Sequence, residues 1–402
     1  MPRQHPALFV ALVTAMVAIN PVSMDLYLPS MPEMARVFGA TPGEVQVTLS
    51  VYTLSFAVAQ LGYGPLTDRF GRRPVALAGL VIYIAASLAC ALATSIGMLI
   101  ALRVAQAFGS CAAGVVARAA VRDTHDLHGS ARVFAHMGMA MSMTPLIAPT
   151  IGGVLQELFG WRAPFGFMAL AGVSLLVLVF LVLTETNASP DRRALRLGRL
   201  AANYVYVLTH RQFLGYALSS AFSFASVFVF LSYAPFVLID LLGVRPGAFG
   251  LVFGLVGLGF GTGALLSTRV TPRLGVDRTI LIGALGTLAG GVLLNALAFS
   301  GVFGVAAIIG PVALSGVAAG LIMPNTQAGA VNPFPHIAGV AAAAGGFLQM
   351  GLAAVAGTIA VRLYDGTQLP MTLGMLICPL LMTVAFTGLI WRRRAAAPEA
   401  AR

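Results

Sequence analysis

Long apolar stretches alternate with short polar connections along the whole chain. A helix needs about 20 residues to cross the roughly 30 Å hydrocarbon core of a bilayer, and twelve stretches reach that length. They run over about 6–30, 44–64, 74–94, 97–119, 133–157, 162–184, 212–239, 247–269, 277–299, 302–330, 336–361 and 369–391. The pattern therefore predicts an all-α membrane protein with twelve transmembrane helices.

Composition excludes a water-soluble domain. Hydrophobic residues make up 58% of the 402 residues and charged residues only 9%, against roughly 45–50% and about 25% in ordinary soluble domains. So few charges cannot coat a globule of this size, and lipid must cover much of its surface. The sequence also has neither a P-loop, which would bind a nucleotide, nor an H-E-x-x-H motif, which would bind zinc. We therefore expect no enzyme, no ATP-driven transport and no cofactor.

The basic residues, which are all Arg, predict how the chain is oriented. With both termini in the cytoplasm, nineteen of the 24 fall on the cytoplasmic side and one, Arg103, lies inside a stretch. The four on the outer side are Arg36, Arg162, Arg245 and Arg362. Cytoplasmic connections collect positive charge, so this bias predicts that both termini are cytoplasmic. Because the arginines lie between apolar stretches instead of along one basic stripe, nucleic-acid binding is not expected.

One connection is much longer than the others and divides the apolar stretches six and six. It runs from Glu185 to about Arg211 and contains a cluster of four arginines at 192, 193, 196 and 199. We therefore expect an N-terminal six-helix half at 1–184, a cytoplasmic linker at 185–211 and a C-terminal six-helix half at 212–402.

A weak internal repeat supports this division. The segment Phe70–Pro74 after the second stretch resembles Leu274–Arg278 after the eighth, and Arg69 corresponds to Arg273. Both segments occupy the same place in their half, as a duplicated six-helix unit predicts.

The connection from Gly64 to Pro74 has a composition that topology alone does not explain. Asp68 stands next to a group of arginines, whereas the positive-inside rule asks for no acid. A carboxylate here can accept hydrogen bonds from the N-terminus of a neighbouring helix, while arginines bridge to other acids and to lipid phosphates. Such a cluster would hold the cytoplasmic side shut in one state; the alternative is a simple topology signal. The residues assigned to this cytoplasmic gate are Gly64, Asp68, Arg69, Gly71, Arg72, Arg73 and Arg118.

Several motifs together resemble the major facilitator superfamily, and the resemblance covers nearly the whole chain. Gly64–Pro74 is similar to its loop 2–3 signature, G-x-L-a-D-r-x-G-r-r. Arg103–Gly109 is similar to the helix-four motif R-x-x-Q-G, with Ala107 in place of the glycine. Pro145–Gly153 is similar to the helix-five motif G-P-x-x-G-G of the antiporter branch, with Ala148 in place of its first glycine.

Two further segments, Met24–Pro32 and Arg118–Asp123, look like the Bcr/CflA drug-resistance subfamily, which exports bicyclomycin- or chloramphenicol-type compounds. This resemblance implies a major facilitator fold of two pseudo-symmetric six-helix halves in a bacterial inner (plasma) membrane. It also implies export, because the helix-five residues Pro149, Gly152 and Gly153 match the motif thought to seal the proton leak path.

Asp25 is the only acid that falls clearly within an apolar stretch. An ionisable group there is expensive and is a functional hypothesis by default. At 1.5 Å rise per residue, Asp25 lies about 6 Å and Arg103 about 9 Å from the outer ends of their helices, so we expect the two to be partners. Burial favours the neutral acid and Arg103 favours the carboxylate, so this pair could load and unload a proton. The alternative is a fixed ion pair that pins helices one and four.

A broad drug pocket needs deformable apolar walls with few fixed polar points. Polar and aromatic side chains on the helices expected to line the midline fit this need, although each one singly could equally face lipid or pack between helices. The residues assigned to the substrate cavity are Tyr27, Tyr52, Phe56, Gln60, Gln106, Met141, Pro145, Phe224, Tyr233 and Gln349.

The sequence thus predicts a monomeric transporter that exports small amphipathic drugs in exchange for protons by alternating access, in contact with membrane lipid. No metal site is expected, because the three cysteines lie inside apolar stretches without C-x-x-C spacing. Two alternatives stay open. One is a proton-coupled exporter of an endogenous metabolite or amino acid; the other is a non-transporting membrane receptor or scaffold.

Overall fold

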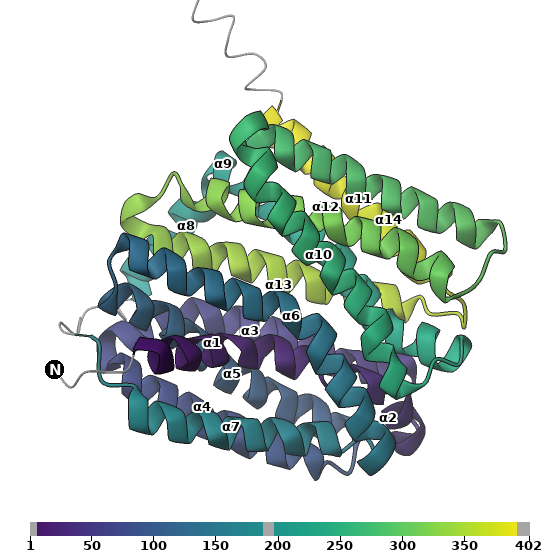
Figure 1. Ribbon diagram of the computed structural model, residues 1–402, viewed down its shortest axis with the longest axis horizontal. Coiled ribbons are helices and arrows are strands. Elements are labelled where there is room, and N and C mark those ends of the chain that lie inside the picture. Colours follow the sequence, from purple (N-terminus) through teal and green to yellow (C-terminus); the bar gives the residue numbers. More distant parts are fainter. Residues whose placement is uncertain (1–5, 188–196, 392–402) are drawn as a thin grey trace, which may run out of the picture. The chain divides into compact units, whose positions relative to one another are not determined.

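The computed structural model describes residues 6–187 and 197–391, and every regular element in those ranges is helical (Figure 1). Twelve helices are long and apolar enough to cross a membrane, so the predicted all-α, twelve-helix architecture is confirmed. The elements of the N-terminal part are α1 (Pro6–Asp25), η1 (Leu28–Ser30), α2 (Met31–Phe38), α3 (Pro42–Phe70), α4 (Arg72–Ala91), α5 (Ile96–Thr124), α6 (Leu127–Phe159) and α7 (Ala163–Val182). Those that follow are α8 (Leu197–Thr209), α9 (Arg211–Pro235), η2 (Phe236–Leu241), α10 (Pro246–Leu274), α11 (Val276–Phe299), α12 (Val305–Val331), η3 (Pro335–Ile337), α13 (Ala338–Arg362), α14 (Leu369–Phe386) and η4 (Thr387–Trp391).

The chain packs as two compact units. The first comprises Met1–Leu200 with the short segment Arg245–Leu251, and the second comprises Ala201–Val244 with Val252–Arg402. The predicted boundaries of the halves and the linker stay a prediction.

The first span is longer than its sequence pattern indicated. The expected range ended near residue 30, whereas the apolar helical column runs from Ala7 to Phe38. Helix α1 ends at Asp25, and a turn with η1 and α2 continues the column beyond it. Asp25 therefore lies 13 residues before the end of this column at Phe38. This is farther from the outer end of the first span than the sequence pattern indicated.

The internal repeat is confirmed by backbone geometry. Helices α3 and α10 are both 29 residues long, and each ends one residue before a glycine. Gly71 has φ 95° and ψ 160°, and Gly275 has φ 81° and ψ 163°. Only glycine adopts such positive φ values readily, so the two turns are built in the same way from the same residue.

Close helix packing brings the elements of the first unit together. A Cβ atom on Gly109 of α5 would lie 2.5 Å from the backbone nitrogen of Tyr83 on α4. Likewise, a Cβ atom on Gly152 of α6 would overlap the carbonyl oxygen of Leu26. Glycine at these two positions permits an approach that any side chain would prevent, as is common where membrane helices pack.

Candidate functional sites

A buried arginine forms the first candidate site, inside the first unit. Arg103 on α5 is fully buried. Its Nη1 donates hydrogen bonds to the backbone oxygen of Ser23 at 3.1 Å and to Oε1 of Gln106 at 2.6 Å. The guanidinium carbon lies 4.3 Å from the ring centre of Tyr27 and 4.2 Å from that of Tyr52. The charge is thus held against two aromatic faces by cation–π attraction.

The groups around Arg103 are themselves fixed by hydrogen bonds. The hydroxyl of Tyr52 lies 2.7 Å from Ser110 Oγ and donates to Oδ1 of Asn20 at 3.1 Å. The amide nitrogen of Gln106 donates to Ser87 Oγ at 2.8 Å. In this arrangement Tyr27, Tyr52 and Gln106, all predicted to line the substrate cavity, are fully buried and support the arginine.

Asp25 lies near this cluster but is not paired with it. Its side chain is 6% exposed at the last residue of α1. Within residues 6–187 and 197–391, its carboxylate has no hydrogen bond, and no Arg103 nitrogen lies within 4.0 Å of it. The contact between Arg103 and Ser23 brings α5 to within two residues of Asp25. Helices α1 and α5 therefore meet next to Asp25, but no ion pair joins Asp25 to Arg103 among the described residues. Their partnership in proton coupling stays a prediction.

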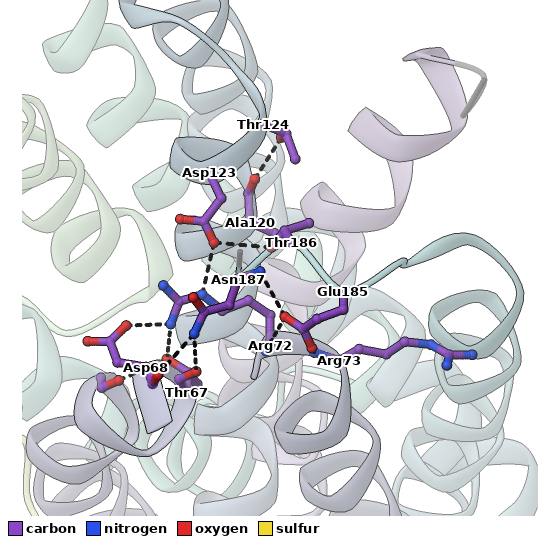
Figure 2. A network of polar contacts seen from close by, with 11 residues as sticks. Thr67, Asp68, Arg72, Arg73, Ala120, Asp123, Thr124, Glu185, Thr186 and Asn187 are labelled. Atoms are coloured by element: carbon purple, nitrogen blue, oxygen red, sulfur yellow. Dashed lines mark hydrogen bonds and ion pairs between the residues drawn. The ribbon is translucent and has the colours of Figure 1, made fainter. Parts of the chain in front are cut away.

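The second candidate site is a polar network around Arg72 (Figure 2). Arg72, at the start of α4, forms an ion pair with Asp68 at the end of α3. Its Nε donates to Oδ2 of Asp123 on α5 at 2.9 Å, and its Nη1 donates to Thr67 Oγ1 at 2.8 Å. One guanidinium thus joins three helices of the first unit through charge-assisted hydrogen bonds.

Glu185 caps the first turn of α4. Its Oε1 accepts a hydrogen bond from the backbone nitrogen of Arg72 at 2.9 Å, and its Oε2 accepts one from that of Arg73 at 3.1 Å. A carboxylate satisfies the free N–H groups of a helix start and is favoured by the helix dipole. The prediction gave this role to Asp68, which pairs with Arg72 instead, so that assignment is wrong. The cause is geometric: Asp68 lies in the turn before Arg72, whereas Glu185 approaches from the end of α7, as Figure 2 shows.

The residues that follow Glu185 bind the end of α3 and the end of α5. The side-chain nitrogen of Asn187 donates to the backbone oxygen of Asp68 at 2.9 Å. Thr186 Oγ1 donates to Asp123 Oδ2 at 3.1 Å. The segment 185–187 therefore places an acceptor at the start of α4 and a donor at the end of α3. These are the partners required by the free N–H groups and the free C=O groups on the two sides of the Gly71 turn.

The other predicted gate residues take different positions. Arg73 stacks on the Phe180 ring, with 5.2 Å to its centre, and donates to the Phe180 backbone oxygen at 2.8 Å. Arg69 lies 5.1 Å from the Phe70 ring centre, and the backbone oxygen of Gly64 accepts from Thr67 Oγ1 at 2.9 Å. Arg118 forms no ion pair in the described part of the chain and does not join the network.

The predicted helix-five motif lies within one continuous helix. Pro145 and Pro149 are both inside α6, and Gly152 and Gly153 follow in its last turns. The close approach of Gly152 to Leu26, just after Asp25, gives the motif a packing role next to the end of α1. Its part in sealing against protons stays a prediction.

The remaining predicted cavity residues differ in how far they are buried. Tyr233 is buried and donates to the backbone oxygen of Ala360 at 2.5 Å, whereas Met141 is 43% exposed. Phe56 and Gln349 are buried, and Gln60, Pro145 and Phe224 are partly buried. The second unit contains a cavity of about 10 Å³, room for about one water molecule, and these predicted residues do not line it. Their place in a substrate cavity stays a prediction.

Comparison with known proteins identifies the family. The Major Facilitator Superfamily model matches residues 13–358. The chain belongs to this superfamily. It is therefore a multi-pass membrane transport protein and not an enzyme, which removes the non-transporting alternative.

Several curated relatives are drug-resistance proteins. The chain is 29% identical to the bicyclomycin resistance protein homolog of Haemophilus influenzae, over 96% of this chain and 97% of that protein. It is 31% identical to the chloramphenicol resistance protein of Pseudomonas aeruginosa, over 85% and 80% of the two chains, and 28% identical to multidrug resistance protein D of Escherichia coli, over 98% of both. The predicted resemblance to drug-efflux members is confirmed.

A solved structure supports the fold alone. The xylose transporter from Escherichia coli, in a partially occluded inward-open conformation, matches with a TM-score of 0.75 at 14% identity, over 96% of this chain and 99% of that chain. The major facilitator fold with two six-helix halves is thus confirmed for this transporter.

The sequence predictions missed several residues of the Arg72 network, among them Asp123, Glu185 and Asn187. In the sequence analysis, Asp123 enters only as the last residue of a subfamily motif and Glu185 only as the first residue of the long connection, and Asn187 does not enter. The sequence did contain a signal for Glu185 and Asn187, because both come directly after an apolar stretch. An acid can accept from the free N–H groups at a helix start, and an amide can donate to the free C=O groups at a helix end. Their partners lie more than 100 residues away for Glu185 and Asn187, a separation that no local pattern reveals.

Proposed function

We propose that this transporter exports small amphipathic drugs, of the bicyclomycin and chloramphenicol type, in exchange for protons by alternating access. The observation that carries the coupling is Asp25, a buried carboxylate without a partner in the described part of the chain. Burying a charged carboxylate without a partner costs several kcal/mol of free energy, about as much as burying any other unpaired ion. Asp25 therefore takes up a proton when it is buried. It releases that proton when it is exposed to water or approaches Arg103.

Arg103 is the fixed member of this proposed pair. Its Nη1 is held by Ser23 and Gln106 and the guanidinium is stacked on Tyr27 and Tyr52, while Nε and Nη2 have no hydrogen-bond partner among the described residues and are available to Asp25. A small shift of α1 against α5 would then change the environment of Asp25 while Arg103 stays in place. The mobile charge in this proposal is the proton on Asp25.

The Arg72 network is the proposed cytoplasmic gate. Its contacts join the ends of α3, α5 and α7 to the start of α4. We propose that these ends change their spacing when the cytoplasmic side opens, so that the network acts as a latch that stabilises one state. A single chain supplies all twelve spanning helices, and we propose that it works as a monomer with both termini in the cytoplasm.

The substrate class rests on the names of the relatives, which include bicyclomycin and chloramphenicol resistance proteins. The test uses inside-out vesicles with an acidic lumen and a fluorescent pH reporter. Chloramphenicol, florfenicol, bicyclomycin, a sulfonamide and a lipophilic cation are added in turn. We expect at least one compound to dissipate the gradient in wild-type vesicles, and Asp25→Asn to abolish that response.

Asp365→Asn is the matched control. Asp365 is an exposed acid in the connection between α13 and α14, bound only by Thr367 in its own turn, so the response should be kept. An unchanged response in Asp25→Asn would contradict the role of Asp25. Silence toward every compound, with folded protein in the vesicles, would contradict the drug class and favour export of an endogenous metabolite.

A further inference from the structure

The cavity in the second unit corresponds, through the internal repeat, to the Arg103 site of the first unit. Pro42 at the start of α3 matches Pro246 at the start of α10, an offset of 204 residues, and both helices are 29 residues long. The starts of α4 and α11, at residues 72 and 276, have the same offset. The starts of α5 and α12, at residues 96 and 305, are offset by 209 residues. These offsets assign a counterpart to each residue of the Arg103 site on α3, α4 and α5.

The assigned counterparts all line the cavity. Tyr83 belongs to the Arg103 site, because its hydroxyl lies 2.7 Å from Oγ of Ser23, whose backbone oxygen binds Arg103. The pairs are Tyr52 with Val256, Tyr83 with Thr287, Arg103 with Val312, Gln106 with Ser315 and Ser110 with Ala319.

The first span of each half adds a further pair of polar residues. Ser223 and Ser226 of α9 line the cavity and are three residues apart. Asn20 and Ser23 of α1 have the same spacing and bind the hydroxyls of the two tyrosines in the Arg103 site. The cavity and the Arg103 site are therefore built from corresponding positions of four helices.

The counterparts explain why the second unit has a cavity at this place. Each of the five is smaller than its partner in the first unit, and no charged residue lines the cavity. The space that a guanidinium and two tyrosine rings occupy in the first unit is thus left as a volume of about 10 Å³.

One hydroxyl that lines the cavity has no hydrogen bond. Ser223 is 1% exposed, and its Oγ has no partner among the described residues. A buried hydroxyl without a hydrogen bond is unfavourable. Two neighbouring hydroxyls can still accept: Oγ1 of Thr287 donates to the backbone oxygen of Ala284 at 2.9 Å, and Oγ of Ser315 donates to that of Pro311 at 3.0 Å. Each has thereby used its one proton and keeps lone pairs.

The size and the chemistry of the cavity fit one water molecule. A buried water needs roughly 10–15 Å³ of such volume and makes about three hydrogen bonds to protein. A drug-sized compound is far larger than the cavity. Calcium and magnesium favour carboxylate ligands, and the lining residues include none.

We propose that this cavity binds one water molecule, which accepts a hydrogen bond from Ser223 and donates to Thr287 and Ser315. The water joins α9, α11 and α12 inside the second unit without any charge. Of the two corresponding sites, the one in the first unit then carries the cation, and the one in the second is neutral. The proposal does not depend on the identity of the exported compound or on proton coupling.

X-ray radiolytic labelling with mass spectrometry tests the site in the full-length protein in detergent. Hydroxyl radicals formed from a bound water oxidise the side chains next to it, and methionine oxidises readily. Met375 lines the cavity and is 2% exposed. Met382 on the same helix, α14, is 0% exposed, does not line the cavity and serves as the reference. We expect Met375 to be oxidised several-fold faster than Met382.

Two substitutions test which hydroxyls hold the water. Ser223→Ala should slow the oxidation of Met375, and Ser223→Ala with Thr287→Val should reduce it to the rate of Met382. The matched control is Ser219→Ala, because Ser219 is a buried serine of the same helix whose hydroxyl donates to the backbone oxygen of Gly215 at 2.7 Å. It should leave the oxidation of Met375 unchanged.

Three results would overturn the proposal. Equally slow oxidation of both methionines in the unmodified protein would mean that the cavity is dry. Equally fast oxidation of both would mean that bulk water enters the second unit. Fast oxidation of Met375 that neither Ser223→Ala nor the double variant slows would mean that these hydroxyls do not hold the water.

Discussion

Arg103 and Asp25 lie on neighbouring helices of the first unit and differ in the contacts that replace their lost hydration. The arginine has two aromatic faces and two oxygen acceptors, which replace part of its lost hydration. The aspartate has no such partner among the described residues. Both groups are thus incompletely compensated, because Nε and Nη2 of Arg103 also have no hydrogen-bond partner among the described residues.

The first prediction concerns the shape of the Arg103 side chain. Arg103→Lys keeps the charge but loses the planar group that lies against both Tyr27 and Tyr52, because an ammonium is a compact, strongly hydrated point charge. We expect it to destabilise the protein by about 1–3 kcal/mol, seen as a lower midpoint of thermal unfolding in detergent. Arg69→Lys, at an exposed position, is the matched control and should leave the midpoint unchanged; equal midpoints for the two variants contradict the prediction.

The second prediction separates support of Arg103 from substrate contact at Tyr52. Tyr52→Phe keeps the ring under the guanidinium and removes only the hydroxyl that binds Ser110 and Asn20. We expect a loss of about 1 kcal/mol of stability with drug-dependent transport retained, whereas Tyr52→Leu should lose both. The measurements are thermal unfolding and the vesicle assay. Transport abolished in a fully stable Tyr52→Phe protein would instead favour the predicted role of Tyr52 in the substrate cavity.

At the scale of elements, the sequence was informative wherever one local pattern decides the structure. Apolar stretches predicted the twelve spans, and Gly71 and Gly275 marked equivalent turns, because length and glycine act locally. The first span was misjudged at its end, because the apolar stretch in the sequence ends near residue 30 while η1 and α2 continue the column. The cap on α4 was assigned to the wrong acid, because Glu185 comes from a distant segment.

The third prediction compares the two repeated turns. Gly71→Ala and Gly275→Ala both place a side chain at positive φ, which costs about 1–2 kcal/mol. Only at residue 71 would the new Cβ also lie 2.5 Å from Oε2 of Glu185; at residue 275 it meets nothing within 4 Å. We therefore expect Gly71→Ala to be the more destabilising of the pair in thermal unfolding. Equal losses would mean that Glu185 does not hold the turn.

The fourth prediction concerns the cap itself. Glu185→Gln keeps the size of the side chain but removes the negative charge from the start of α4, which should cost about 0.3–1 kcal/mol and loosen the backbone nitrogens of Arg72 and Arg73. Hydrogen–deuterium exchange should rise at the first turn of α4 and stay unchanged at the start of α11, which has its own acid, Asp277. A rise at both helix starts would point to a general loss of stability and contradict a local cap.

At the scale of the whole molecule, the orientation of the chain decides which side of the membrane the Arg72 network occupies. Nineteen arginines lie on one predicted side and four on the other, a bias that sets orientation in bacterial membranes. The α3–α4 turn, the end of α7 and the segment around Glu185 all fall on the arginine-rich side. The proposed gate is a cytoplasmic one only if that side faces the cytoplasm.

The fifth prediction tests this orientation in intact cells. In a protein without its three native cysteines, Thr367→Cys in the α13–α14 connection should react with a membrane-impermeant maleimide added outside, because this connection is exposed and on the arginine-poor side. His210→Cys should react only after the membrane is opened, since this position lies at the end of the arginine-rich connection. The opposite labelling would place the Arg72 network on the outer side of the membrane and would contradict its role as a cytoplasmic gate.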